Sequence, residues 1–259
     1  MMLKVENLTV RIGEKEILKD INLEIKKGEV HVLFGPNGSG KTTLLSALMG
    51  FDECRIVSGK IYFKDEDITT LSIDERARKG MGILFQRPPS IRGVRLGQIV
   101  EICSDGRKNP ESLASVLNFN EFLDRELNVG FSGGELKRSE LLQLLAQDPE
   151  LVLLDEPESG VDIESIELIG EAIGELLERE TGKFREGKAI HKVRYERKKS
   201  ALIITHTGYI LDHIDADIGH VMIEGRLCCL GNPREILKSI RSFGYQECVR
   251  CLQSNNLKR

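Results

Sequence analysis

A glycine-rich segment near the start of the chain has the residue types that bind phosphate groups. It reads Gly35-Pro36-Asn37-Gly38-Ser39-Gly40-Lys41-Thr42-Thr43 and fits the pattern G-x-x-x-x-G-K-[ST]. Glycines let backbone N–H groups approach phosphate oxygens without a Cβ in the way, and a helix beginning near Lys41 directs its positive end at the same anion. Lys41 would then contact the β- and γ-phosphates, while the Thr42 hydroxyl would coordinate Mg²⁺. The segment predicts a nucleotide site, and an unliganded glycine-rich turn is the less favoured interpretation.

A short apolar run that ends in two acids supplies a second set of candidates. Residues 151–154 are Leu-Val-Leu-Leu, which is typical of a buried parallel strand, and Asp155 and Glu156 follow directly. Asp155 would bind the metal, and Glu156 would orient or deprotonate an attacking water. Solvated acids at a strand end are the alternative, but the phosphate-binding segment upstream favours a catalytic role.

These side chains need a sheet to position them. Strand patterns alternate with helical patterns, which predicts an α/β fold with a largely parallel sheet. Between about Pro88 and Gln147 the sequence predicts helices broken by Gly93, Gly97, Gly106 and Pro110. Elsewhere we expect strands over 3–10, 17–25, 30–34, 151–154, 201–205 and 221–223, and helices over 41–49, 163–180 and from 233 onward.

Composition restricts the class of protein. The chain has 259 residues, of which 40% are hydrophobic and 30% charged, so it can bury a large core. Its net charge of −4 argues against binding nucleic acid through the overall field. No apolar run is long enough to span a membrane and no targeting segment is visible, so we expect a cytoplasmic protein without direct membrane insertion. Its six cysteines would stay reduced there.

A third motif indicates the family. Phe131-Ser132-Gly133-Gly134-Glu135 resembles the signature motif of ABC ATPases, in which Leu-Ser-Gly-Gly-Gln is the commonest form. A serine, two glycines and a helix beginning near Glu135 suit anion binding, although an ordinary helix cap is the alternative for these residues alone. In that family the motif contacts the γ-phosphate held by the other subunit. The resemblance therefore implies a transient, ATP-dependent homodimer that closes head to tail.

The other motifs of ABC ATPases follow in order. Gln86 resembles the Q-loop glutamine, which contacts Mg²⁺ and couples to the helical lobe. Residues 159–162 resemble the D-loop, which contains Asp162, and His206 resembles the switch histidine that contacts the γ-phosphate. The resemblance implies that ATP and Mg²⁺ are bound through Lys41, Thr42, Gln86 and Asp155, with Glu156, His206 and Lys41 as the catalytic residues.

The same resemblance implies the domain organisation. We expect a P-loop NTPase of the ABC cassette type, with a RecA-like core, an ABC-type β-subdomain and an inserted helical subdomain. The single domain would cover 1–259, with a core lobe of 1–86 and 148–259 and a helical signature subdomain of 87–147. One position departs from the family: Ile12 stands where an aromatic usually stacks on adenine, so a preference for ATP over GTP stays open.

Several segments resemble SufC, the ATPase of iron–sulfur cluster assembly. They are residues 28–31 before the phosphate-binding segment, Phe85-Gln86 with Pro88 after it, and Ser159-Gly160-Val161-Asp162-Ile163. This resemblance implies a SufB/SufD-like scaffold protein as the partner, remodelled by the ATP-driven motion. Pro157 is the choice typical of transporters, so the ATP-binding subunit of an ABC transporter with a separate permease is the alternative.

A basic stretch over 183–199 is interpreted as an insertion relative to that family. It carries a local net charge of +6, and its first interpretation is a solvated loop. An acidic partner surface or nucleic acid is the functional interpretation, which makes a nucleotide-gated nucleic-acid binding module the third candidate. Only Phe184 and Tyr195 could stack on bases, so we expect no nucleic-acid partner.

Four cysteines near the end of the chain are candidates for a metal site. Cys248 and Cys251 have metal-ligand spacing, but a lone C-x-x-C lacks the second pair of a closed zinc site. The adjacent Cys228 and Cys229 would have to fold close to contribute. Whether these cysteines bind metal stays open, and His31 is expected to be a strand residue with satisfied hydrogen bonds.

Overall fold

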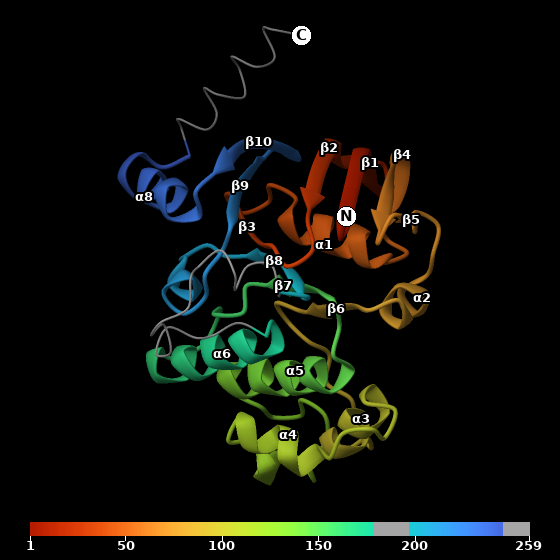
Figure 1. Ribbon diagram of the computed structural model, residues 1–259, viewed down its shortest axis with the longest axis vertical. Helices are drawn as coiled ribbons and strands as arrows, with labels where there is room; N and C mark the ends of the chain where they lie inside the picture. The colour runs from red at the N-terminus through yellow and green to blue at the C-terminus, as the bar shows by residue number, and fades with distance from the viewer. Residues whose placement is uncertain (179–196, 246–259) are drawn as a thin grey trace, which may run out of the picture.

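Two β-sheets form the frame of the protein, whose computed structural model describes residues 1–178 and 197–245 (Figure 1). The antiparallel sheet has the order β2-β1-β4-β5 and contains β1 (Leu3–Ile12), β2 (Lys15–Ile25), β4 (Arg55–Phe63) and β5 (Glu66–Asp67). The second sheet has the order β10-β9-β3-β8-β7-β6 and contains β3 (Val30–Phe34), β6 (Met81–Leu84), β7 (Leu151–Asp155), β8 (Ser200–Ile204), β9 (Ile218–Ile223) and β10 (Arg226–Gly231).

The central strands of the six-stranded sheet are buried on both faces. Every residue of β3, β7 and β8 is buried, and these strands pair in parallel. Because successive side chains point to opposite faces, each strand contributes to two separate cores. In β7, Val152 and Leu154 pack in one core, while Leu151 and Leu153 pack in the other. The continuous apolar runs of the sequence are explained by this double burial.

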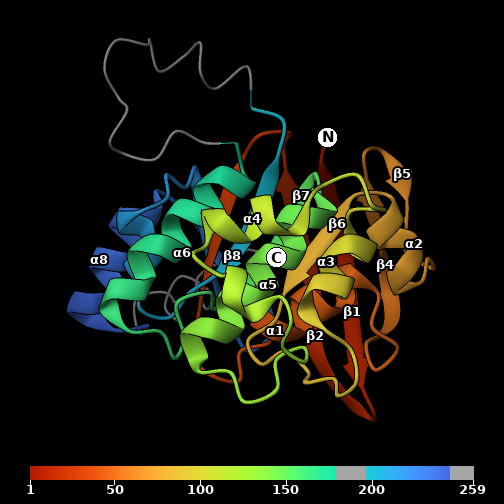
Figure 2. The same ribbon diagram turned by 90° about the horizontal axis from the view of Figure 1, so that it is seen from below.

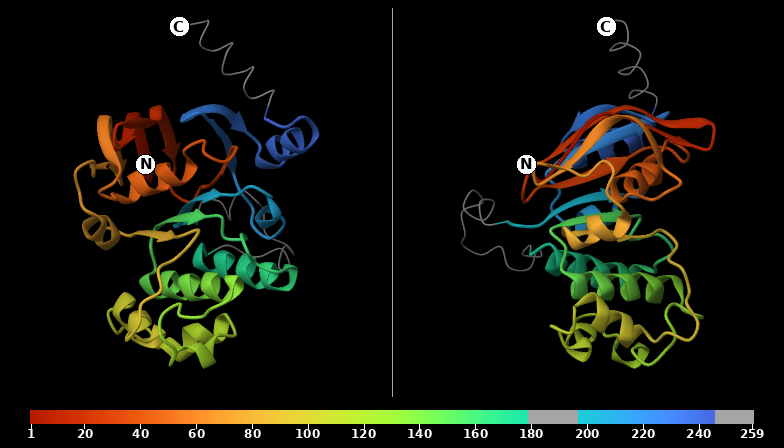
Figure 3. Two further views of the ribbon diagram at one scale, coloured as in Figure 1. Left: turned by 180° about the vertical axis from the view of Figure 1, so that it is seen from behind. Right: turned by 90° about the vertical axis from the view of Figure 1, so that its right-hand side faces the viewer.

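Helices cover each face of this sheet (Figures 1 and 3). On one side α1 (Lys41–Met49) lies between the six-stranded and antiparallel sheets, and its leucines pack with residues of β1 and β2. On the other side lie α5 (Gly133–Gln147) and α6 (Ile163–Leu176), which share a core with Val152 and Leu154. Further helices of the described residues are α2 (Ile73–Arg78), η2 (Tyr209–Asp212) and α8 (Pro233–Phe243).

The segment between β6 and β7 folds into helices at the end of the molecule opposite the antiparallel sheet (Figure 1), and these helices face the viewer in Figure 2. It contains α3 (Leu96–Cys103), α4 (Pro110–Val116), η1 (Asn120–Phe122) and α5. Phe119, Phe122 and Phe131 pack their rings together inside it, with centroids 4.1 to 5.9 Å apart. This aromatic cluster joins η1 to the residues that precede α5.

Two helix predictions are corrected by the structure. Gly97 does not break a helix but lies inside α3, where an added Cβ would come within 3.2 Å of the Leu123 carbonyl oxygen. The helix predicted over 163–180 ends at Leu176, and Glu178 takes the left-handed conformation with φ of 53°. The first error reflects close packing that favours glycine, and the second reflects a helix end without a glycine to mark it.

Several predicted features lie outside the described residues. These are most of the basic stretch, 183–196, and both Cys248 and Cys251. The last three residues of the stretch are described, and two of their cations pair with acids: Arg197 with Asp217 at 3.5 Å and Lys199 with Asp148. Within the described part of the chain, no helix is long and apolar enough to cross a membrane.

Candidate nucleotide site

The phosphate-binding segment connects β3 to α1 as a tight loop. Two of its glycines are required by close contacts, because an added Cβ would lie 2.4 Å from the Met222 carbonyl oxygen at Gly35 and 2.9 Å from Leu18 at Gly40. Gly40 also has φ of 104° and directly precedes the helix. At Gly38, which has φ of 76°, an added Cβ would meet no atom within 4 Å, so this part of the loop faces open space. The loop therefore exposes backbone where an anion can approach.

Lys41 is held inside the loop by backbone oxygens. Its side chain is buried, and Nζ donates to the carbonyl oxygens of Gly35 at 2.8 Å and Pro36 at 2.9 Å. Burial lowers the pKa of Lys41, while the nearby carboxylates of Glu156 and Asp155 raise it. The hydroxyl of Ser39 is buried nearby without a hydrogen-bond partner among the described residues. A buried cation and an unsatisfied hydroxyl in one glycine-rich loop fit a phosphate group.

Thr42 and Asp155 place a hydroxyl near a carboxylate at the carboxyl end of β7. Burial raises the pKa of the Asp155 carboxyl, and the nearby Thr42 hydroxyl lowers it. Asp155 is 3% exposed, and its Oδ1 has no hydrogen-bond partner in the described part of the chain. A hydroxyl beside a buried carboxylate with a free oxygen fits Mg²⁺, which prefers such hard ligands.

Glu156 lies between the amide of Gln86 and the imidazole of His206. Gln86 Nε2 donates to Glu156 Oε2 at 2.7 Å, and His206 Nε2 pairs with Glu156 Oε1. Three strand ends supply these residues, since Gln86 follows β6, Glu156 follows β7 and His206 follows β8. The backbone of Glu156 takes φ of 50° and donates its N–H to Ile204 at 3.1 Å. Three residues predicted separately from the sequence are therefore brought into contact.

The signature residues begin α5 and lie against the D-loop. The Ser132 hydroxyl accepts from the Glu135 N–H at 3.4 Å, and Ser132 N–H donates to the Glu135 carboxylate at 2.7 Å. An added Cβ at Gly133 would lie 2.2 Å from the carbonyl oxygen of Gly160. Asp162 caps α6 by accepting from Ser165 N–H at 2.9 Å. The signature and the D-loop therefore form one unit of this chain.

This unit lies on the other side of the six-stranded sheet from the helix that follows the phosphate-binding segment. The buried leucines of α1 belong to one core, and those of α5 belong to the other. Figure 1 shows the two helices separated by β6, β7 and β8. The helices that follow the phosphate-binding segment and the signature serine therefore pack on opposite faces of this sheet.

Two buried charges in α5 were not predicted as part of the site. Lys137 Nζ donates to the carbonyl oxygens of Phe85 at 2.5 Å and Gln86 at 3.1 Å. Glu140 accepts from the Phe85 N–H at 2.9 Å, and burial raises the pKa of Glu140 to about 7. Lys137 and Glu140 are three positions apart on a helix face that is otherwise buried. Two charged residues in such a pattern are the sequence signal that could have identified them.

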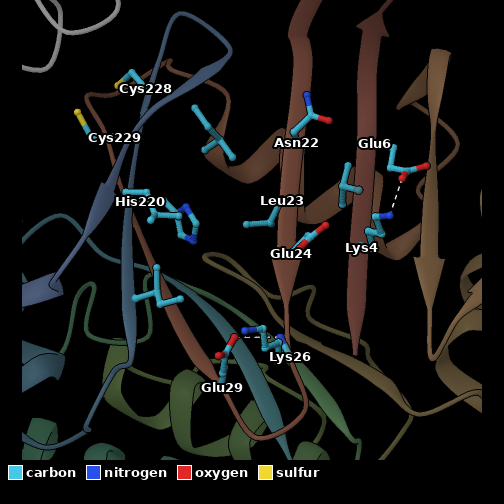
Figure 4. Close-up of a pocket in the computed structure, with 14 residues that line it drawn as sticks. Lys4, Glu6, Asn22, Leu23, Glu24, Lys26, Glu29, His220, Cys228 and Cys229 are labelled. Atoms are coloured by element: carbon cyan, nitrogen blue, oxygen red, sulfur yellow. Dashed lines mark hydrogen bonds and ion pairs between the residues drawn. The ribbon is translucent and has the colours of Figure 1, made fainter. Parts of the chain in front are cut away.

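A separate cleft of about 650 Å³ lies between β2 and the β9–β10 hairpin (Figure 4). His220 lines it, and His220 Nε2 lies 2.9 Å from Nδ1 of the fully buried His31. His31 Nε2 pairs with Glu29 Oε2 at 3.1 Å, so both ring nitrogens of His31 are satisfied, as expected. Cys228 and Cys229 also line the cleft, and no three metal-ligating side chains cluster within the described residues.

Comparison with sequences of known proteins identifies relatives over nearly the whole chain. The family described as ABC transporter matches residues 18–159. A probable ABC transporter ATP-binding protein of Streptococcus pyogenes is 36% identical over 245 residues, covering 89% of each chain. The probable ATP-dependent transporter ycf16 of Trieres chinensis is 34% identical, covering 95% of this chain and 96% of its own. Vegetative protein 296 of Bacillus subtilis is 35% identical, covering 94% and 91%.

Solved structures agree with these relatives. The ADP conformation of an ATP-binding cassette of an ABC transporter superposes with a TM-score of 0.71 at 26% identity, covering 97% of this chain and 98% of that one. A dimeric post-hydrolysis state of another cassette, bound to ADP and Pi, superposes with a TM-score of 0.70 at 21% identity, covering 90% and 99%. At 21% identity, the comparison with the dimeric cassette shows a shared fold alone.

Proposed function

This chain belongs to the ABC transporter family of ATP-binding cassettes, and on that premise we propose that two copies close head to tail on MgATP and hydrolyse it to drive a conformational change in a partner protein. The chain has the P-loop ABC cassette fold and is an ATP-binding ATPase. The observation that carries the proposed mechanism is Glu156, a carboxylate at the end of β7 that lies between Gln86 and His206 beside the phosphate-binding loop.

Each residue of this cluster has a defined part in the proposed hydrolysis. Lys41 exchanges its two carbonyl contacts for phosphate oxygens, so its charge offsets that of the β- and γ-phosphates. Glu156 orients the attacking water and takes its proton, while His206 donates a hydrogen bond to the γ-phosphate. Thr42 and Asp155 would hold Mg²⁺, and Gln86 would supply a further oxygen ligand. When bound, the metal ion neutralises charge that develops on the phosphate oxygens.

The dimer is supported by the separation of the phosphate-binding loop from the signature motif. The helices that follow these two sites pack on opposite faces of the six-stranded sheet, which fits a signature serine that serves the nucleotide of a second copy. Backbone N–H groups at the start of α5 would then complete the γ-phosphate site. We assign 87–147 to the helical subdomain that moves with the signature, and 1–86 with 148–259 to the core lobe.

We favour a SufB/SufD-like scaffold protein as the partner and a cytoplasmic location. The support is the D-loop sequence Ser159-Gly160-Val161-Asp162, together with Phe131 at the start of the signature. Nucleic acid is disfavoured because the net charge is −4 and because two of the three described cations of the basic stretch, Arg197 and Lys199, pair with acids.

The second candidate is the ATP-binding subunit of a transporter that pairs with a separate permease. Pro157 favours it, and relatives at 34–36% identity have names that include transporter. The ATPase chemistry is the same in both candidates, so the partner alone decides between them.

Capture of the partner tests the proposal. A tagged Glu156→Gln chain, which should retain MgATP without hydrolysing it, is used to isolate partners from its native lysate with and without MgATP. A scaffold protein recovered from the soluble fraction supports cluster assembly. A multi-span permease recovered from the membrane fraction overturns it in favour of transport. The matched Lys41→Met chain should lose any ATP-dependent capture.

A further inference from the structure

A third carboxylate lies directly beyond the catalytic cluster, and the proposed mechanism does not use it. Glu158 is two residues after Glu156 and is 7% exposed. Its Oε2 is buried without a hydrogen-bond partner among the described residues. Burying a carboxylate is unfavourable unless specific contacts compensate for the lost water. The contacts of its other oxygen therefore indicate why an acid occupies this position.

Glu158 Oε1 accepts hydrogen bonds from two threonine hydroxyls. One is Thr205, which is fully buried at the end of β8, and the other is Thr207, at 3.1 Å. Thr205 and Thr207 are the two neighbours of His206 in the chain. One carboxylate oxygen therefore fixes the backbone on both sides of this histidine.

The same hydroxyls also shape the loop after His206. Thr205 Oγ1 accepts from the Gly208 N–H at 2.8 Å, and Thr207 Oγ1 accepts from the Tyr209 N–H at 3.3 Å. Gly208 has φ of 73°, and an added Cβ there would lie 2.4 Å from Leu237. The conformation of this turn therefore depends on the glycine at position 208 and on the threonine hydroxyls that Glu158 holds.

The carboxylates of Glu156 and Glu158 contact successive residues of the loop that follows β8. Glu156 pairs with the imidazole of His206, while Glu158 holds the residues before and after it. The Glu156 N–H also donates to Ile204 at 3.1 Å, which ties the two strand ends together. Because the imidazole has only two side-chain torsions, its position follows the backbone that Glu158 holds.

We propose that Glu158 is a positioning residue for ATP hydrolysis, which holds Thr205 and Thr207 so that the His206 imidazole stays aligned with Glu156 and the γ-phosphate site. This inference rests on the catalytic roles proposed for Glu156 and His206. It also connects the D-loop to the histidine, because the D-loop begins at Ser159 on the same turn, where Val161 N–H donates to the Glu158 carbonyl oxygen at 3.4 Å.

The chemistry of the contact predicts which substitutions are tolerated. Glutamine at position 158 keeps an oxygen that accepts from both threonines, whereas leucine leaves two hydroxyls without their acceptor. Thr207→Val removes one donor at an exposed position, so it should fold even if Glu158→Leu does not. Thr70→Val changes an exposed threonine between β5 and α2 and serves as the matched control.

Steady-state ATP hydrolysis gives the first readout. Glu158→Leu and Thr207→Val should each lower kcat by about tenfold, because small misplacements of catalytic groups cost rate, while KM for ATP changes less than about twofold. Glu158→Gln and Thr70→Val should stay within about twofold of the wild-type kcat. Wild-type turnover in Thr207→Val, or a change confined to KM, would overturn the inference.

The imidazole itself gives a second readout that does not depend on turnover. The chain has five histidines, so the His206 ring signal in a ¹H–¹³C NMR spectrum can be assigned by its loss in His206→Ala. Glu158→Leu and Thr207→Val should shift or broaden this signal, and Thr70→Val should not. An unmoved His206 signal would overturn the positioning role even if kcat falls. If instead His206→Ala retains wild-type turnover while the signal moves, it is the proposed catalytic role of His206 that fails.

Discussion

Replacing His220 by glutamine should make the protein less sensitive to acid. His220 is 4% exposed in the cleft of Figure 4, and its Nε2 lies 2.9 Å from His31 Nδ1. Since Nε2–H of His31 faces the Glu29 carboxylate, His31 Nδ1 is the acceptor and His220 Nε2 the donor. Both rings are then neutral. Glutamine keeps an N–H donor at a similar position but cannot take up a proton near neutral pH.

The sign of the effect follows from the depressed pKa of His220. Burial, and to a lesser extent the neighbouring His31, lower the pKa of His220 from 6.5 to about 3. Below pH 6.5 the unfolded chain binds a proton that the folded chain excludes, so stability is full above this pH and is lost as the pH falls toward 3. Between pH 7 and pH 5 this one site should lower the free energy of unfolding by about 2 kcal/mol.

Urea unfolding at pH 7 and pH 5 measures this difference. Because the chain has no tryptophan, far-ultraviolet circular dichroism is the suitable signal. The loss of stability between the two pH values should be about 2 kcal/mol smaller in His220→Gln than in the wild type, and contributions from carboxylates cancel in this comparison. His213→Gln, a half-buried histidine, is the matched control. Equal losses in His220→Gln and wild type would refute the account of this buried pair.

Three further substitutions test other parts of the structure. Lys41→Met should lower kcat by about 100-fold or more, as measured by phosphate release, because it removes the positive charge that faces the phosphates. Wild-type turnover in this variant would contradict the role proposed for Lys41. Glu156→Gln should abolish hydrolysis but retain ATP in equilibrium dialysis, and loss of binding would point to a structural role. Arg76→Met should lower the free energy of unfolding in urea by about 3 kcal/mol, because it leaves buried carbonyl oxygens without a donor; an unchanged midpoint would contradict this. The carbonyl oxygens that Arg76 contacts at 2.8–3.0 Å belong to Ala47, Leu48, Thr69 and Leu71.

Sequence patterns predicted the central strands well because those strands are buried on both faces. The apolar runs at 30–34 and 151–154 became β3 and β7, and the helix at 41–49 became α1. Strand β4 was not predicted, since only two of its nine residues, Ile61 and Phe63, are buried, so its hydrophobic pattern is weak. A strand of this kind is determined by pairing with β1, which lies far away in sequence.

The residues of the candidate site also divide into those that sequence motifs identify and those that only the fold brings together. Motif residues such as Lys41, Asp155 and Glu156 are recognisable because each lies in a short segment of fixed spacing. Glu140 and Lys137 are not, because their partners at 85 and 86 lie more than 50 residues away in the sequence. Glu158 contacts its threonines across a similar gap of 47 and 49 residues. The packing of α5 against β6 and the register between β7 and β8 bring such groups together.

The central claim is that each phosphate-binding loop is completed by the signature of a second copy. Light scattering on purified Glu156→Gln with and without MgATP tests it most directly, with Glu156→Gln/Ser132→Arg as the matched control. Arginine at the signature should obstruct the partner's γ-phosphate site without touching the chain's own loop. We expect the mass to double with MgATP in Glu156→Gln and to stay that of a monomer in the double variant. A doubling that Ser132→Arg leaves unchanged, or a Glu156→Gln chain that binds ATP but stays a monomer, would contradict the head-to-tail arrangement.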